Sequence, residues 1–194
     1  MHCTRKPKQL MEFKNTIQAM QKLGGNVVKD GKNILNKEKK AGGTLYNDFD
    51  YLVTASKNSV TLEFEFGKAD DYWAFVDEGV KGAGGFKGSG RMRGQGSPFR
   101  FGSGKYKGKW PQFTSAIQKW IKKKGIKGRN KETGKFITNK SLGFLIQRAI
   151  YQRGLTRTQF FSRPFKSELN KQTDAILNAF GKDLDKELEI IIGK

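Results

Sequence analysis

Apolar positions recur at helical spacing near the start of the chain, which predicts a long helix beginning at about Glu12. The pair Gly24-Gly25 interrupts this row. Because glycine weakens a helix interior by about 1 kcal/mol relative to alanine, we expect the helix to kink or restart there. The sequence Ala41-Gly42-Gly43 ends the pattern. The row itself comprises Phe13, Ile17, Met20, Leu23, Val27, Ile34 and Leu35.

Two strands are predicted next. Residues 45–54 are rich in Tyr, Phe, Leu and Val, and residues 60–66 alternate strictly between apolar and polar side chains. Such alternation indicates a sheet with one buried and one solvated face. Residues 56–59 then form the turn of an antiparallel hairpin. The aromatic and acidic residues 71–79 fit a short helix or turn packed on this sheet.

Further helices are predicted in the second half of the chain. Residues 113–124 place Phe113, Ile117, Trp120 and Ile121 on one face, and residues 141–153 form a helix with Ser141 as its cap and Gly154 as its stop. A proline turn ends the aromatic segment 160–165, whose rings fit either a core or a subunit interface. The last helix then begins near Lys166, with Gly181 as a candidate bend. Its apolar row comprises Leu169, Ile176, Leu177, Phe180, Leu184 and Leu188.

This order of elements predicts an α+β fold, because nothing suggests alternating βαβ units. It consists of an N-terminal helix, an antiparallel β-hairpin with helices packed on it, a long Gly/Lys-rich loop and a C-terminal helix. A chain of 194 residues favours a single domain. We divide it into a helix and hairpin part (10–79), a basic arm (80–112) and a helical part (113–194).

Cysteine content and the polar N-terminus indicate the compartment. Cys3 is the single cysteine, so no intramolecular disulfide or CxxC zinc site can form. We expect neither a signal peptide nor a membrane span, and therefore a protein that is made in a cytoplasm and folds reduced.

Positive charge is concentrated in the middle of the chain. The formal net charge is +20, and residues 81–140 carry 17 Lys and Arg against one acid, Glu132. Such a field attracts polyanions by counterion release, without reading their sequence. Solvated loops or an acidic surface of another protein are the alternative explanation.

The stretch from Gly79 to Trp110 is rich in glycine, lysine and arginine and contains no acid. It does not match a phosphate-binding loop, since no Gly-Lys pair in it is followed by Ser or Thr. We expect an arm that faces either a neighbouring subunit or DNA, with aromatic anchors among its basic residues. The candidate residues of this arm are Lys81, Lys87, Arg91, Arg93, Phe99, Arg100, Phe101, Lys105, Tyr106 and Lys107.

Catalytic chemistry finds little support. The sole histidine is His2, so a nucleophilic serine would lack a base. The carboxylate pairs Asp70-Asp71 and Asp77-Glu78 have no further ligands spaced nearby and more often act as caps or ion-pair partners. We predict no catalytic residue, metal or cofactor, and hence no enzyme. An enzyme with an unrecognised site is the alternative, and these pairs alone speak for it.

Two short motifs carry a resemblance to a known family. The segment 72–79, Tyr-Trp-Ala-Phe-Val-Asp-Glu-Gly, follows the hairpin, and the segment 161–165, Phe-Ser-Arg-Pro-Phe, precedes the closing helix. In this order the chain resembles the small head–tail connector, neck or tail-completion proteins of tailed bacteriophages, over roughly residues 10 to 190. The matching motif residues are Phe75, Glu78, Gly79, Pro164 and Phe165. The long basic insert after Gly79 and the helix pair that follows it depart from the family pattern.

The resemblance implies a structural protein of the virion, in its neck or tail region, without catalytic activity. It implies a homo-oligomeric ring, six- or twelvefold, whose partners are copies of itself, adjacent portal, connector or tail proteins, and DNA in the channel. The alternative is a non-enzymatic protein that binds nucleic acid without sequence preference through its basic middle third.

Overall fold

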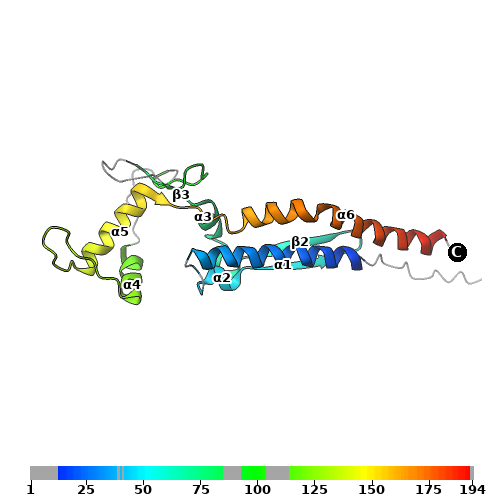
Figure 1. Ribbon diagram of the computed structural model, residues 1–194, viewed down its shortest axis with the longest axis horizontal. Helices are drawn as coiled ribbons and strands as arrows, with labels where there is room; N and C mark the ends of the chain where they lie inside the picture. The colour runs from blue at the N-terminus through cyan, green and yellow to red at the C-terminus, as the bar shows by residue number, and fades with distance from the viewer. Residues whose placement is uncertain (1–12, 39, 41, 85–92, 104–113, 193–194) are drawn as a thin grey trace, which may run out of the picture. The chain divides into compact units, whose positions relative to one another are not determined.

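The computed structural model describes residues 13–38, 40, 42–84, 93–103 and 114–192, with the side chains of 189–192 left out (Figure 1). It confirms the predicted α+β class. The chain divides into two compact units, one formed by residues 1–73 and 159–194, the other by residues 74–158. Each is described by itself, and the expectation that the whole chain is one domain stays a prediction.

The first unit combines two long helices with a hairpin. Helix α1 (Lys14–Lys37) contacts both α6 (Ser162–Ile192) and the hairpin of β1 (Asp50–Ala55) and β2 (Val60–Glu65). The strands pair antiparallel from Asp50 opposite Glu65 to Ala55 opposite Val60. The amide of Ser56 donates to the carbonyl of Ser59 at 2.8 Å, which confirms the predicted turn. The short helices α2 (Thr44–Asp48) and η1 (Gly67–Ala69) flank the hairpin.

The restart expected at Gly24-Gly25 is wrong, because α1 runs through both glycines as one helix. A Cβ atom on Gly24 would lie 2.7 Å from Cγ of Tyr51 in β1. Two turns further along the same face, a Cβ atom on Gly31 would lie 2.6 Å from Cε1 of Phe49 and 2.7 Å from the carbonyl oxygen of Phe160. These glycines therefore let two aromatic rings approach the helix backbone closely, and they do not break the helix.

Several predicted boundaries also need correction. Residues 44–48 form α2, so the first strand begins only at Asp50. Helix α1 ends at Lys37, before the glycines at 42 and 43. Helix α6 begins at Ser162 and contains Pro164 in its first turn, where the missing amide proton of proline costs no helical hydrogen bond.

Aromatic rings form the core of the first unit. Phe49, Phe66 and Phe160 are buried, and the ring of Phe49 stacks on that of Phe66 at 5.2 Å and meets that of Phe160 edge-on at 5.5 Å. Trp73, the first residue of α3 (Trp73–Glu78), stacks on Phe66 at 4.2 Å. Rings from the two predicted strands, from the segment 71–79 and from the segment 160–165 thus meet in one cluster.

The second unit contains a helix pair and a small ladder. Helix α4 (Thr114–Lys124) packs on α5 (Asn139–Arg153), and Ile117 and Ile121 are buried between them. Trp120, predicted on this apolar face, is instead 47% exposed. Strand β3 (Val80–Lys81) pairs antiparallel with β4 (Gly154–Leu155).

The ends of α5 are set by two residues. Its N-cap is Thr138, whose hydroxyl oxygen accepts from the amide of Ser141, so the prediction of Ser141 as the cap is wrong. Gly154 ends the helix with φ +90°, a conformation that favours glycine, as predicted.

Candidate interaction surfaces

The glycine of the first motif, Gly79, lies in a crowded backbone turn of the second unit. Gly79 has φ +71°, and a Cβ atom there would lie 2.6 Å from the carbonyl oxygen of Leu155 and 2.7 Å from the amide of Arg157. The hydroxyl of Ser97 donates to the carbonyl of Gly79 at 2.8 Å. Both the backbone angle and the close approach therefore require glycine at this position. Phe75 and Glu78 precede this glycine in the chain; Phe75 is exposed and Glu78 is half-buried.

The second family motif lies in the first unit. Pro164 is buried, and Phe165 stacks on Phe161 at 5.5 Å and meets Phe64 of β2 edge-on at 5.8 Å. Phe165 thus attaches the start of α6 to the hairpin, and Pro164 lies buried in the first turn of that helix.

The described parts of the predicted arm, residues 80–84 and 93–103, are hydrogen-bonded to each other and to the rest of the chain. The amide of Lys81 donates to the carbonyl of Phe99 at 2.8 Å, and the amide of Phe101 donates to the carbonyl of Lys81 at 2.9 Å. The amide of Arg93 donates to the carbonyl of Arg153. Lys81 is half-buried, while Arg93 and Arg100 are exposed. Lys87, Arg91, Lys105, Tyr106 and Lys107 lie outside the described residues.

The two aromatic anchors pack within the second unit. The ring of Phe99 meets that of Phe75 edge-on at 4.5 Å, and the ring of Phe101 lies 6.0 Å from that of Tyr151. They border an open groove of about 460 Å³. Its lining consists of Phe75, Val80, Pro98, Phe99, Arg100, Phe101, Ser103 and Leu155. The structure therefore brings Phe75 of the family motif together with three of the predicted arm residues.

Helix α6 buries polar side chains and exposes apolar ones. Glu168, Gln172 and Asp183 are buried. The exposed residues form an apolar row along the helix, and Leu177 is the most exposed of them at 62%. This row comprises Leu169, Leu177, Phe180 and Leu188. Helical spacing predicted the row, but not that it would be left open to solvent.

Asp183 caps the N-terminus of α1 from the neighbouring helix. Its carboxylate accepts from the amide of Thr16 at 2.8 Å and the amide of Asn15 at 3.1 Å, and also from both of their side chains. Burial alone would raise the pKa of Asp183, but the hydrogen bonds from Thr16 and Asn15 outweigh it and hold the pKa below its usual value. The N-cap residue of α1, Phe13, makes no side-chain cap hydrogen bond, and Asp183 takes that role.

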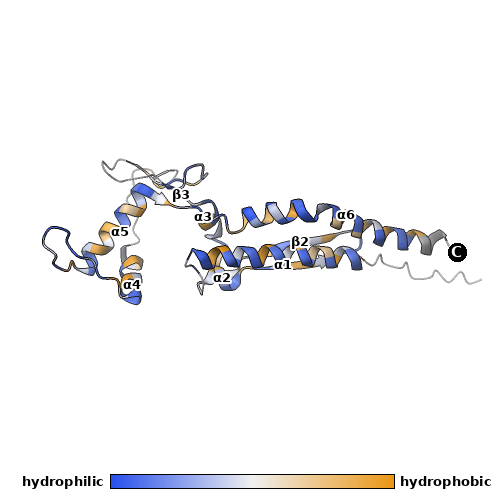
Figure 2. Ribbon diagram, in the orientation of Figure 1, coloured by the Kyte–Doolittle hydropathy of each residue, from blue (hydrophilic) through white to orange (hydrophobic). Residues whose placement is uncertain are grey.

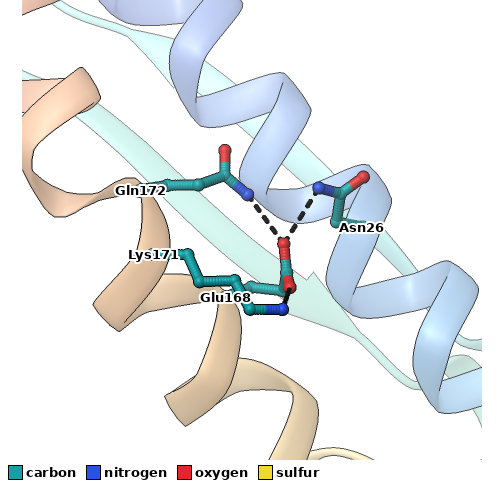
Figure 3. A network of polar contacts seen from close by, with 4 residues as sticks. All are labelled: Asn26, Glu168, Lys171 and Gln172. Carbon is teal, nitrogen blue, oxygen red and sulfur yellow. Dashed lines mark hydrogen bonds and ion pairs between the residues drawn. The ribbon is translucent and has the colours of Figure 1, made fainter.

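A second carboxylate joins the same two helices (Figure 3). Glu168 of α6 accepts from the amide groups of Asn26 at 2.9 Å and Gln172 at 3.0 Å, and it pairs with Lys171 at 2.7 Å. The hydrogen bond from Lys171, followed by that from Asn26, lowers the pKa of Glu168. The pairing of α1 with α6 therefore relies on ionised carboxylates.

A structured basic loop joins α4 to α5, and we call residues 127–137 the basic finger. Arg129 and Phe136 pair as an antiparallel bridge, and the amide of Asn130 donates to the carbonyl of Lys135 at 2.8 Å. The side-chain oxygen of Asn130 accepts from the amides of Glu132 and Thr133. The loop is drawn in blue between α4 and α5 in Figure 2, since nearly all of its residues are hydrophilic.

The sequence showed the positive charge of residues 81–140, but its pattern did not predict this hairpin between the two helices. The signal that could have found it is Asn130 four residues before Gly134, which has φ +66°. An asparagine that binds the amides two and three residues ahead, followed by a left-handed glycine, is a common way to close a turn.

The described part of the chain contains neither a candidate metal site nor a candidate membrane-spanning helix. Within it, no group of three or more His, Cys, Asp or Glu side chains is placed to hold a metal ion. None of its helices is long and apolar enough to cross a membrane.

We compared the chain with protein-family models, with curated proteins and with solved structures, and none of the three comparisons found a match.

Proposed function

We propose that the protein is a structural, non-enzymatic component of a tailed-phage virion that forms a homo-oligomeric ring in the neck, head–tail connector or tail-completion region. Its partners are then copies of itself and the adjacent portal, connector or tail proteins. The resemblance carried by the two motifs supports the class of virion protein. The surface of α6 supports its capacity to assemble.

The exposed apolar row on α6 is the observation that carries the assembly proposal. Isolated exposed leucines are ordinary on protein surfaces, but several on one helix face form a patch that water solvates poorly. On the same helix, buried Glu168 and Asp183 bind α1. The rings of Phe165 and Phe180 do pack on rings of the same chain, and Phe180 stacks on Phe13 at 6.2 Å. The leucines of the row, in contrast, are left exposed for another surface.

The placement of the motif residues supports the resemblance. Gly79 sits where only glycine fits, and Pro164 and Phe165 begin the closing helix at the aromatic core. Each motif thus stabilises the fold of the subunit, as expected in a family of structural proteins. The arm, residues 80–112, remains proposed as the segment that reaches a neighbouring subunit or the DNA channel.

Light scattering on nucleic-acid-free protein tests the proposal. We expect a discrete species of six or twelve chain masses at physiological and at high salt, since apolar contacts resist salt screening. Leu177→Glu places a charge within the apolar row and is expected to shift the protein to monomers. Ser167→Glu, at an exposed position of α6 outside the row, is the matched control and is expected to keep the oligomer.

Two results would contradict the proposal. A monomer at the highest soluble concentration would contradict self-assembly into a ring. An oligomer that survives Leu177→Glu unchanged would show that the interface lies elsewhere.

A further inference from the structure

We propose that the basic finger and the adjoining end of α4 form a binding site for the phosphodiester backbone of nucleic acid. The sequence offered DNA contact either for the arm at 80–112 or, in the alternative reading, for the whole basic middle third, whereas this site is confined to residues 119–140. The inference does not rest on the ring, because it concerns a surface of the single subunit.

Charge density is the first argument. Nine lysine and arginine side chains between residues 119 and 140 are all exposed, against the single acid Glu132. In the described part of the chain, none of the nine pairs with a carboxylate. They are Lys119, Lys122, Lys123, Lys124, Lys127, Arg129, Lys131, Lys135 and Lys140. Each therefore keeps its full charge for a polyanion, and each phosphate it neutralises releases counterions.

Shape is the second argument. Cross-strand hydrogen bonds and the Asn130 turn hold the finger in one hairpin, so its cations are presented without a large ordering cost on binding. At its base, the amide of Ile137 donates to the carbonyl of Gly128 at 3.0 Å. Arg129 lies in the bridge, Lys131 in the turn and Lys135 just before the bridge residue Phe136, so one ordered loop carries three cations that can contact neighbouring phosphates.

The finger also offers an aromatic ring beside its charges. Phe136 is 60% exposed, with the guanidinium of Arg129 4.3 Å and the ammonium of Lys127 5.9 Å from the ring centroid. An exposed ring of this kind can stack on a sugar or an unpaired base.

Composition favours nucleic acid over an acidic protein as the partner. Lysine is depleted from protein–protein interfaces, whose centres are apolar. Here lysine is the dominant residue, and within the described segment 119–140 the exposed large apolar side chains are Trp120 and Phe136. Phosphate contacts, in contrast, are made mainly by lysine and arginine and need no apolar centre.

Fluorescence anisotropy with a labelled 20-base-pair DNA duplex tests the site over a range of salt concentrations. The finger variant is Arg129→Gln/Lys131→Gln/Lys135→Gln. The matched control, Lys29→Gln/Lys37→Gln/Lys68→Gln, removes the same charge from exposed positions of the first unit. We expect the finger variant to bind at least ~10-fold more weakly and the slope of log K against log salt to fall by about 2 to 3, with the control close to wild type.

Three results would overturn the proposal. Equal losses in the two variants would show that net charge alone attracts DNA, and no loss in either would place the contact elsewhere. Binding of polyglutamate as tight as that of DNA, with the same loss in the finger variant, would identify an acidic protein as the partner. Circular dichroism and the oligomeric mass of each variant show whether fold or assembly has changed, so a failure of the ring proposal is recorded separately.

Discussion

Single residues decide how closely the two long helices approach their neighbours. Gly24 is the clearest case, since the ring of Tyr51 occupies the space of its missing side chain. We expect Gly24→Ala to lower the free energy of unfolding by about 1–3 kcal/mol, because the ring must move out of a packed position.

A second glycine of the same unit serves as the control for that substitution. A Cβ atom on Gly181 in α6 would meet nothing within 4 Å. Gly181→Ala should therefore raise the free energy of unfolding by about 0.5–1 kcal/mol, through the ordinary helix preference of alanine. Urea unfolding of both variants checks the pair. Changes of opposite sign in the free energy of unfolding support the packing argument, whereas stabilisation by both substitutions would contradict it.

Asp183 is the residue whose removal should most weaken the junction of α1 and α6. Asp183→Asn replaces an acceptor oxygen by a donor that faces the amides and hydroxyl of α1. The loss of the cap and the unsatisfied donors should cost about 1–3 kcal/mol in urea unfolding. Asp185→Asn is the control, because Asp185 is exposed. A loss of the same size in the control would attribute the effect to charge on α6 and not to the cap.

At the scale of elements, the pairing of α1 with α6 should depend on pH. Folding lowers the pKa values of both Asp183 and Glu168. Their contribution to stability is therefore complete above their unfolded pKa values, about 3.9 and 4.3, and is lost as the pH falls through the lower folded values.

Urea unfolding at pH 7 and pH 3 checks this dependence. The free energy of unfolding should fall on acidification, and it should fall less in Asp183→Asn than in wild type. An undiminished pH dependence in that variant would show that other carboxylates are responsible.

The sequence predicted the elements whose patterns are local. The strand 60–66, the turn 56–59 and the helix 114–124 follow from alternation, turn residues and helical spacing within a few positions. The unbroken α1 was missed because Gly24 and Gly31 are explained only by rings from distant segments. The cap of α1 could not be predicted either, since Asp183 is 167 residues from Thr16.

The candidate surfaces were predictable only in part. Composition located the positive charge, but not the hydrogen bonds that shape residues 127–137 into a finger. Likewise, the apolar row of α6 was visible as spacing, yet spacing alone cannot show whether a helix face is buried by its own chain or left open.

At the scale of the whole molecule, the excess positive charge belongs to one of the two units. Residues 74–158 carry 20 Lys and Arg against three acids, and the remaining residues carry 18 against 15. The exposed row of α6 belongs to the nearly balanced unit. Assembly through α6 and polyanion binding through the finger should therefore respond differently to salt: DNA affinity should fall steeply as salt rises, while the oligomeric mass should hold.

Electron microscopy of the purified protein, freed of nucleic acid, tests the central claim most directly. The account predicts closed rings of six or twelve subunits in wild type and in Ser167→Glu, and their loss in Leu177→Glu. Single subunits, open chains or irregular clusters in the wild-type protein would contradict it.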